Sequence, residues 1–323
     1  MQFTRVSPRQ APPDQDPRVY ADLQELIRLQ FKAKGFSYLP RQPVHSVLYG
    51  RHASRLRGRG LNFEELRNYL PGDDIRNVDW KASARSNRPQ VRVYTEERDR
   101  PVWLLVDQRI SMFFGSRERL KSVTAAEAAA VSAWRVLGMG DRVGAMVFND
   151  SAIVEIKPQR SRNQVMGILG EVVRQNHALH AGADIAPGPA IFNSVLRRLL
   201  PLVGHDALVV LISDTNGADD HSARLVTRIN QHNDVIVLLV YDPMERRLPD
   251  AGRLVMSDGR GQLEVNSGRS GLRKAYAGHF DDNLLEIQAL SRKHAIPLLP
   301  ISTEYPVLDQ VREQLGQRAA RRT

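Results

Sequence analysis

The sequence contains no cysteine, and this absence removes several chemistries at once. Without thiols the chain can form no disulfide, no thiolate metal site and no cysteine nucleophile. Long apolar runs are also missing, since the run Val235–Val240 has only the length of a strand, and a membrane-spanning helix needs roughly 20 residues. The polar, proline-containing residues 1–17 lack the apolar core of a secretory signal. We therefore expect a cytoplasmic protein without a membrane span.

Acidic residues are in the minority, with 36 Asp and Glu against 46 Lys and Arg, which leaves a net charge of +10. A basic chain favours acidic partners such as nucleic acid, an anionic membrane or an acidic protein. Many arginines gather in two places: Arg51, Arg55, Arg57, Arg59 and Arg67 in the N-terminal third, and Arg318, Arg321 and Arg322 at the end. Glycine–aromatic RNA motifs and a helix-turn-helix pattern are missing from the sequence. Nucleic-acid binding therefore remains an alternative function, with a solubilising charge surplus as the simpler interpretation.

From residue 101 onwards, strand-like and helix-like segments alternate. We expect strands at 102–106, 142–148, 153–156, 207–213, 235–241 and 297–301, and helices at 120–137, 162–174, 190–200, 220–230, 284–294 and 307–318. Such alternation builds a mostly parallel sheet with helices on both faces. The tight turn at Asn149-Asp150-Ser151 predicts one antiparallel strand at the sheet edge.

The chain divides into three expected regions. Residues 1–16 are polar enough to be disordered, residues 17–100 form an N-terminal helical and extended segment with a helix near 18–34, and residues 101–323 form the α/β domain. A loop is expected at 40–60 from its Pro, Gly and Arg content. Two short apolar runs flank Ser257-Asp258-Gly259-Arg260-Gly261, which predicts a β-hairpin inserted near 245–270.

Two of the predicted buried strands end on a carboxylate. The run Val102–Val106 is followed by Asp107, and Ala207–Ser213 is followed by Asp214. Open α/β sheets bind ligands at the carboxyl ends of their strands. We therefore expect Asp107 and Asp214 to mark a candidate site at one sheet edge.

A second cluster of acids precedes the α/β region, in the block YLPGDDIRNVDWKASAR at 69–85. Its acids Asp73, Asp74 and Asp79 could join Asp107 and Asp214 in a metal-dependent hydrolase, but no general base or activated nucleophile accompanies them. Arginines lie within a few residues of each acid, which favours ion pairs that fix a loop. The turn at Pro71-Gly72 is expected to open a short helix capped by a carboxylate. Trp80 and Trp103 are expected to pack in a core or between domains.

The block at 69–85, the following VRVYTEER at 91–98 and the strand that ends at Asp107 resemble a bacterial family known as domain of unknown function 58. The residues that carry this motif are Tyr69, Pro71, Gly72, Asp73, Asp74, Arg76, Asp79, Trp80 and Arg85. The resemblance extends from about Arg51 to the C-terminal region. It implies a von Willebrand A-like (Rossmann-type) core after an N-terminal extension, and a MoxR-type AAA+ ATPase as partner, with other von Willebrand A proteins as further partners. It supplies no catalytic mechanism, so we expect no enzyme.

The von Willebrand A pattern implies a metal-ion-dependent adhesion site: Asp-x-Ser-x-Ser after the first strand, a later threonine, and an aspartate after the fourth strand. Such oxygen ligands suit Mg²⁺. Here Asp107, Ser111 and Asp214 fill three positions, but Arg109 replaces the first serine. The loop at 181–185 has no threonine. Two of five ligand positions fail, so the resemblance implies a degenerate site with no metal; a Mg²⁺-dependent protein-binding domain stays an alternative, with Asp107, Ser111 and Asp214 as ligands.

Arg109 also adds a permanent positive charge where a ligand is lost. We expect its guanidinium to pair with Asp107 or Asp214 and to replace the neutralising charge of Mg²⁺. The alternative is that Arg109 points to solvent above an empty site. These patterns together predict a non-enzymatic interaction module or adaptor, with Asp107, Arg109, Ser111 and Asp214 as its partner-binding site.

Overall fold

The computed structural model describes residues 16–33, 36, 61–71, 73–96, 100–180, 189–257 and 262–320. The chain forms two compact units: residues 42–99, and residues 1–41 together with 100–323. The division after residue 99 lies next to the expected boundary at residue 100, but residues 17–41 belong to the larger unit, because helix α1 (Leu23–Arg28) packs against helices α3 and α4 of that unit. The segment expected to be disordered, apart from Asp16, and the loop expected at 40–60 lie outside the described residues.

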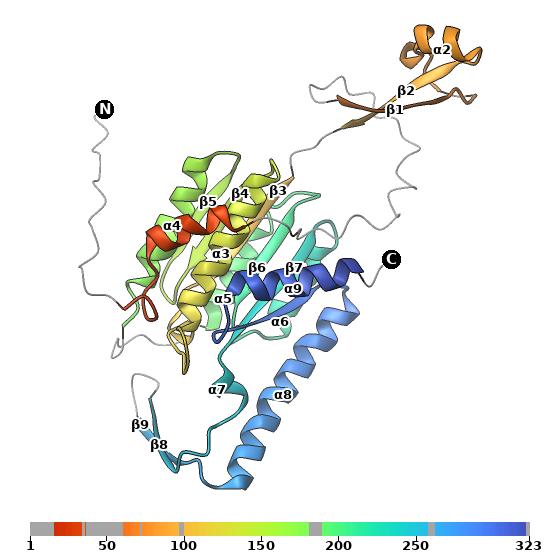
Figure 1. The fold of residues 1–323 in the computed structure, drawn as a ribbon. Helices are drawn as coiled ribbons and strands as arrows, with labels where there is room; N and C mark the ends of the chain where they lie inside the picture. The colour runs from red at the N-terminus through yellow and green to blue at the C-terminus, as the bar shows by residue number, and fades with distance from the viewer. Residues whose placement is uncertain are drawn as a thin grey trace, which may run out of the picture. The chain divides into compact units, whose positions relative to one another are not determined.

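The larger unit contains a six-stranded sheet in the order β10-β7-β6-β3-β4-β5 (Figure 1). Its strands are β3 (Pro101–Asp107), β4 (Arg142–Phe148), β5 (Ile153–Gln159), β6 (Leu208–Ser213), β7 (Asp234–Tyr241) and β10 (Leu298–Ser302). All neighbours are parallel except β5, which runs antiparallel to β4 after the predicted turn. The strand order reverses between β3 and β6, as in doubly wound folds. This confirms the expected fold class, an α/β fold with a mostly parallel sheet.

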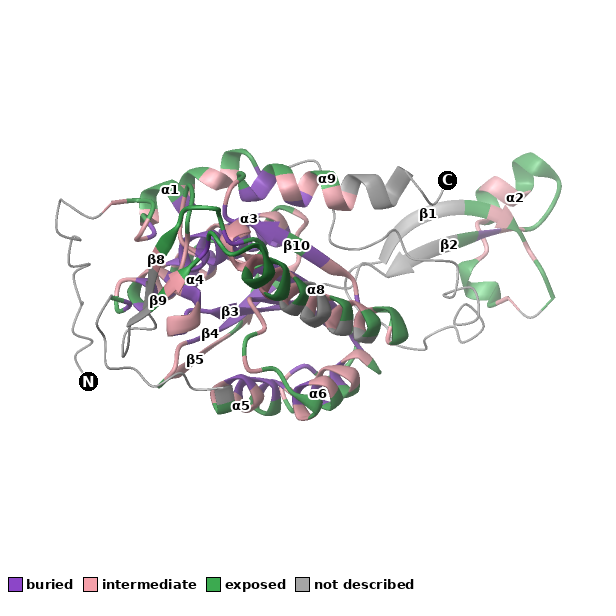
Figure 2. Cartoon of the chain, turned by 90° about the horizontal axis from the view of Figure 1, so that it is seen from below, coloured by how far each residue is buried: buried purple, intermediate pink, exposed green. Residues whose placement is uncertain are grey.

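Helices cover both faces of this sheet, as expected, because each central strand is apolar on both sides. Val102, Leu104 and Val106 of β3 pack into one core, and Trp103 and Leu105 pack into the other. The first face carries α1, α3 (Lys121–Gly138), α4 (Arg162–Asn176) and α9 (Val307–Ala320); the second carries α5 (Pro189–Leu199) and α6 (Asp220–Asn230). Figure 2 shows the buried strands between these two layers.

The predicted insertion is confirmed as a hairpin. Strand β8 (Arg253–Ser257) pairs antiparallel with β9 (Gln262–Asn266), after the short helix α7 (Pro243–Arg246). The following helix α8 runs over Ser270–Lys293, so it begins well before the predicted start at 284. At the N-terminus, the helix expected over 18–34 is shorter, since α1 ends at Arg28 and a 3-10 turn, Leu29–Phe31, follows. No helix in the described part of the chain combines the length and apolarity needed to cross a bilayer.

The smaller unit is a two-stranded sheet with short helices at one end. Strand β1 (Leu61–Asn68) pairs antiparallel with β2 (Gln90–Glu96), and the connection holds the 3-10 turn η3 (Ile75–Asn77) and helix α2 (Trp80–Ser86). The expected ion pairs are present, with Asp73 bound by Arg67 at 2.7 Å and Asp79 bound by Arg92 at 2.8 Å.

The carboxylates of this block also cap its helices, as expected for a turn that opens a helix. Asp74 accepts from the backbone N–H of Arg76 at the start of η3, and Asp79 accepts from Lys81 and Ala82 at the start of α2. Of the two tryptophans expected in a core or between domains, Trp103 is buried in the larger unit, whereas Trp80 enters no core of the smaller unit and is 68% exposed. A two-stranded sheet with a seven-residue helix offers no second layer to cover it.

Candidate functional site

The candidate site lies at the carboxyl edge of the large sheet, where the strand order reverses. Asp107 is the last residue of β3, and Ser213 is the last residue of β6, with Asp214 directly after it. Because β3 and β6 are parallel neighbours, both strand ends meet at this point. The structure therefore brings together the two carboxylates that the sequence singled out, at the position where doubly wound sheets bind ligands.

Arg109 binds Asp107 through its whole guanidinium edge, and neither residue is open to solvent. The Arg109 Nη2 atom donates to Asp107 Oδ2 at 2.6 Å, and Nε donates to both oxygens at 3.0 and 3.1 Å. Asp107 is 0% exposed and Arg109 is 3% exposed. Ser213 Oγ donates a further hydrogen bond to Asp107 at 2.6 Å. The predicted pairing is confirmed, and the alternative of a solvent-facing Arg109 is wrong.

The remaining faces of Arg109 are also occupied. Its Nη1 atom donates to the backbone carbonyl of Asn216 at 2.9 Å, and its Nη2 atom lies 3.5 Å from Asp214 Oδ1. The guanidinium carbon stands 5.8 Å from the ring centre of Phe148 and 5.3 Å from that of Phe192. Such rings attract a cation and exclude water. Arg109 thus joins the loops after β3 and β6 into one rigid edge.

Lys121 supplies a second buried cation, which the sequence reasoning missed. Its Nζ donates to Asp214 at 2.9 Å and to Glu245 at 2.5 Å, and the side chain is 3% exposed. Lys121 is the first residue of α3, where the helix dipole disfavours positive charge. The carboxylates of Asp214 and Glu245 therefore hold Lys121 against the local preference of the helix. A lysine at the start of an alanine-rich helix was the only signal in the sequence.

Charges alternate along this edge, from Asp107 through Arg109, Asp214 and Lys121 to Glu245. Burial acts against the charged form of Asp214, but Lys121 and Arg109 outweigh it, so the pKa of Asp214 is lowered. Burial likewise opposes the charge on Lys121, but Asp214 and Glu245 outweigh it and raise the pKa of Lys121. Asp214 and Lys121 are therefore both ionised at neutral pH, whereas burial raises the pKa of Asp107 against the effect of Arg109.

Asp242, directly after β7, extends the same edge, and the sequence analysis did not predict it as part of the site. Its carboxylate accepts from the backbone N–H and hydroxyl of Ser116, from Met244 N–H and from the hydroxyl of Thr303 after β10. The N–H of Asp242 donates to Glu245, so this cluster connects to the Lys121 ion pair. Four parallel strands thus end in polar groups that share one network.

Ser111 does not behave as a ligand of this network. Its Oγ is buried, yet it has no hydrogen-bond partner among the described residues. The loop that carries it is held elsewhere, because Ile110 N–H donates to Asp150 at 2.6 Å. The threonine-free loop at 181–185 lies outside the described residues.

The residues present do not fit a Mg²⁺ ion. A metal ligand needs a free oxygen lone pair, but both oxygens of Asp107 already accept from Arg109, and Asp214 accepts from Lys121 and Asn216 N–H. Two cations, Arg109 and Lys121, already balance these acids, so a divalent ion would add repulsion. In the part of the chain that is described, no three His, Asp or Glu side chains are arranged to hold a metal.

The acids considered for a hydrolase are each occupied within their own unit. Asp73, Asp74 and Asp79 belong to the smaller unit, where ion pairs and helix caps occupy them. Asp107 and Asp214 lie in the larger unit and are bound by Arg109 and Lys121.

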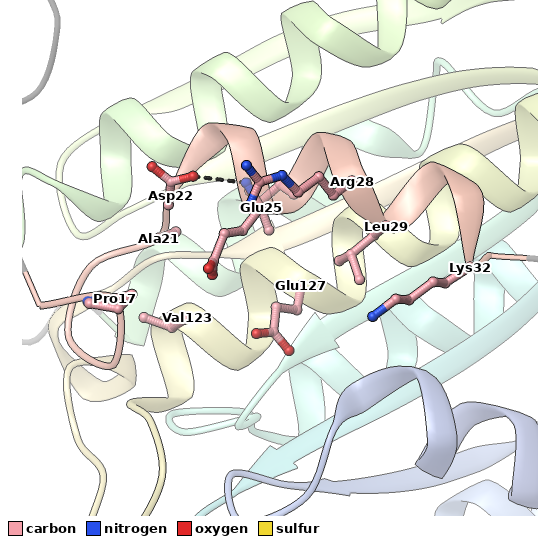
Figure 3. A pocket seen from close by; sticks show the side chains of 10 residues that line it. Pro17, Ala21, Asp22, Glu25, Arg28, Leu29, Lys32, Val123 and Glu127 are labelled. Atoms are coloured by element: carbon pink, nitrogen blue, oxygen red, sulfur yellow. Dashed lines mark hydrogen bonds between the residues drawn. The ribbon is translucent and has the colours of Figure 1, made fainter.

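A pocket of about 320 Å³ with several polar side chains lies between α1 and α3 (Figure 3). Asp22 caps its own helix through Glu25 N–H, and Glu127 forms an ion pair with Arg119 at 2.5 Å. Burial raises the pKa of Glu127, against the effect of Arg119. These groups serve the packing of α1 on α3, so the sheet edge remains the candidate site.

Fold and site together define a doubly wound α/β protein in which the carboxyl edge of the sheet carries a buried ion-pair chain. The family described as "Protein of unknown function DUF58" matches residues 65–283, and the chain belongs to this family.

Individual relatives and solved structures are also similar to this chain. Uncharacterized proteins of Mycobacterium bovis and Mycobacterium tuberculosis are each 29% identical over 265 residues, which cover 82% of this chain and 81% of the relative. Among solved structures, BatB from Bacteroides thetaiotaomicron matches with 13% identity and a TM-score of 0.40, over 69% of this chain and 99% of that one. An aerotolerance-related membrane protein from Bacteroides fragilis matches with 14% identity, the same TM-score and the same coverage.

Proposed function

We propose that this chain is a non-enzymatic interaction module that binds a MoxR-type AAA+ ATPase in the cytoplasm, and that the carboxyl edge of its large sheet is the binding surface. The observation that carries the proposal is the Arg109 guanidinium bound to Asp107 at the switch point of the sheet. It supports a binding edge that keeps its shape without a metal ion.

The network is suited to binding because its groups are already satisfied. A catalytic carboxylate must be free to take a proton or attack a substrate. Asp107 accepts from Arg109 and Ser213, and Asp214 accepts from Lys121 and Asn216 N–H. Groups held in this way position the loops around them, and such preorganisation lowers the entropic cost of binding a partner.

The partner would meet the loop after β6. Asn216 is exposed at this loop, while its backbone carbonyl is fixed by Arg109 below. Thr215 and Gly217 have φ values of +56° and +75°, so the loop has a tight, defined course. The buried ion pairs therefore present an exposed loop in one conformation.

The test is binding of the purified full chain to the purified nucleotide-free ATPase, by calorimetry. The variant Asn216→Lys adds a long charged side chain at the exposed loop and removes none of the hydrogen bonds that Asn216 makes through its backbone. We expect it to weaken binding at least tenfold, or about 1.4 kcal/mol. Gln231→Lys is the matched control, because Gln231 is exposed at the end of α6, near the start of β7.

Three results would count against the proposal. If the wild-type chain does not bind the ATPase, the ATPase is not its partner. If Asn216→Lys and Gln231→Lys weaken binding equally, the carboxyl edge of the sheet is not the binding surface. Loss of binding on addition of a chelator to the nucleotide-free pair restores the Mg²⁺-dependent alternative.

A further inference from the structure

The smaller unit exposes three large apolar side chains on a short stretch of chain. Leu70 is 59% exposed, Ile75 is 63% exposed and Trp80 is 68% exposed. Burying a side chain of this size is worth roughly 1.5–3 kcal/mol. Three of them left in water within eleven residues are therefore unusual for a surface with no partner.

The strand register places these residues at one end of the unit. Asn68, the last residue of β1, pairs with Gln90, the first residue of β2. The connection from residue 69 to residue 89 holds η3 and α2, so both lie at this end of the hairpin. Figure 2 shows exposed residues on α2. Leu70, Ile75 and Trp80 all belong to this connection, and we call its exposed side chains the α2 surface.

Exposed cations accompany the apolar side chains. Arg76, Lys81, Arg85 and Arg88 are exposed, and none of them forms an ion pair with a described residue. Lys81 and Arg85 are four residues apart on α2 and share one side of it, next to the side shared by Trp80 and Ala84. An aromatic side chain is therefore flanked by positive charge.

The acids around this surface are mostly neutralised by its own structure. Arg67 binds Asp73, and Arg92 binds Asp79, with the carboxylates 18% and 15% exposed. Asp74 remains exposed at the start of η3. The α2 surface combines large exposed apolar side chains with charges of mixed sign and a positive excess, a composition that suits a protein interface.

We infer that the α2 surface docks onto an acidic protein surface with an apolar socket for Trp80, and that this surface belongs to the ATPase of the proposed function. The inference rests on that function for the identity of the partner. Tryptophan and arginine are the side chains that most often dominate protein interfaces. With the sheet edge as the other contact, the chain would bind its partner through two sites, which raises the overall affinity.

Charge argues against the chain itself as occupant. Residues 42–99 hold 11 Lys and Arg against 8 Asp and Glu, so the remainder of the chain keeps +7 of the net charge of +10. The larger unit, in the same or in a second copy, is therefore also basic and a poor match. A bilayer or a phosphate backbone favours a surface of one sign, whereas Asp74 interrupts this one. Leu70 and Ile75 cannot stack on bases.

The experiment uses the fluorescence of the full chain, whose three tryptophans differ in exposure. Trp103 and Trp134 are 3% and 6% exposed, so Trp80 dominates quenching by acrylamide. Subtracting the Trp80→Phe variant isolates its signal. We expect the free chain to show an accessible Trp80 at all concentrations, and the ATPase to abolish that accessibility. Vesicles with phosphatidylserine and a single-stranded oligonucleotide should leave it unchanged.

Affinity provides the second readout. Trp80→Ala should weaken binding to the ATPase at least tenfold, while Phe31→Ala should not, because Phe31 is 72% exposed in the larger unit and serves as the matched control. Binding of the ATPase without protection of Trp80 overturns this inference and leaves the proposed function intact. Absence of any binding overturns both. Protection in the free chain, or by vesicles or oligonucleotide in place of the ATPase, assigns the surface to another occupant and overturns the inference.

Discussion

Arg109 Nη2 lies 2.6 Å from Asp107 Oδ2, and the two side chains are 4% and 0% exposed. The two residues are only two positions apart, so the loop after β3 turns its arginine back onto the carboxylate that ends the strand. Charges so deeply buried depend on each other, because removal of one leaves the other without water or a partner. The stability of the larger unit should therefore respond strongly to changes at this pair.

Arg109→Ser should lower the free energy of unfolding by about 3–5 kcal/mol, because it leaves Asp107 buried and unpaired. Denaturant unfolding followed by circular dichroism measures this loss. The control is Arg18→Ser, since Arg18 and Asp16 have the same spacing and a 2.6 Å ion pair, with side chains that are 70% and 39% exposed. The control should unfold like the wild type, and equal losses in both variants would refute the role of burial.

Ser111→Ala should leave stability unchanged or raise it slightly, because a buried hydroxyl with no described partner gains nothing from its polarity. A ligand that binds the folded state raises the melting temperature. Because we expect no Mg²⁺ binding, added Mg²⁺ should leave the melting temperatures of the wild type and of this variant unchanged. A melting temperature that rises with Mg²⁺ in the wild type but not in Ser111→Ala would identify Ser111 as a ligand.

Lys121 and Asp214 should be energetically coupled, because they form a direct ion pair of 2.9 Å in a buried place. In a double-mutant cycle with Lys121→Met and Asp214→Asn, we expect an interaction free energy of about 1–3 kcal/mol. The Arg174–Glu171 pair on α4, whose arginine is 60% exposed, supplies a reference cycle with little coupling. Additive effects at Lys121 and Asp214 would show that the ion-pair chain contributes nothing at this point.

Asp242→Asn should cost about 2–3 kcal/mol at neutral pH, because the amide nitrogen cannot accept the hydrogen bonds of Ser116 and Thr303. Burial raises the pKa of Asp242, but these hydrogen bonds outweigh it, so the pKa is lowered from 3.8. Its contribution is therefore complete above pH 3.8 and is lost as the pH falls through the lower value of the folded state.

Unfolding of wild type and Asp242→Asn in parallel across the acid range tests this dependence. The difference between the two should be constant above pH 3.8 and should shrink below it. A difference that instead grows as the solution becomes more acidic would contradict the lowered pKa.

Gly144→Ala in β4 should be destabilising by about 1–3 kcal/mol, because its new Cβ would lie 2.6 Å from the backbone of Ile156 and of Pro158 on β5. Gly170→Ala on α4 is the matched control, since nothing lies within 4 Å of its Cβ position. It should stabilise the protein by up to about 1 kcal/mol. Melting curves of both variants measure these changes in stability. Equal changes in the two variants would show that the backbone of β5 shifts to accommodate the new Cβ.

Much of the larger unit follows from local sequence. The apolar runs before Asp107 and Asp214 predict buried parallel strands, and the position of Arg109 predicts its ion pair. The tight turn after Phe148 predicts the antiparallel edge strand. These features depend on neighbouring residues or on one general rule of sheet topology, so they can be read without knowledge of distant contacts.

Other features depend on contacts far along the chain. Lys121 meets Glu245 across 124 residues, and Asp242 meets Thr303 across 61. Helix α1 joins the larger unit, and Trp80 has no core to enter, because of packing that no local pattern encodes. Helix α8 also begins earlier than its apolar spacing near 284 indicates.

The sequence by itself determined the alternation of strands and helices in the larger unit, the two strand-end carboxylates and the arginine two residues after the first of them. Only the tertiary structure decided that Lys121, Glu245 and Asp242 join them in one buried network. The physical reason is that secondary structure depends on local periodicity, whereas the cost of burying a charge depends on which opposite charge the fold brings within about 3 Å.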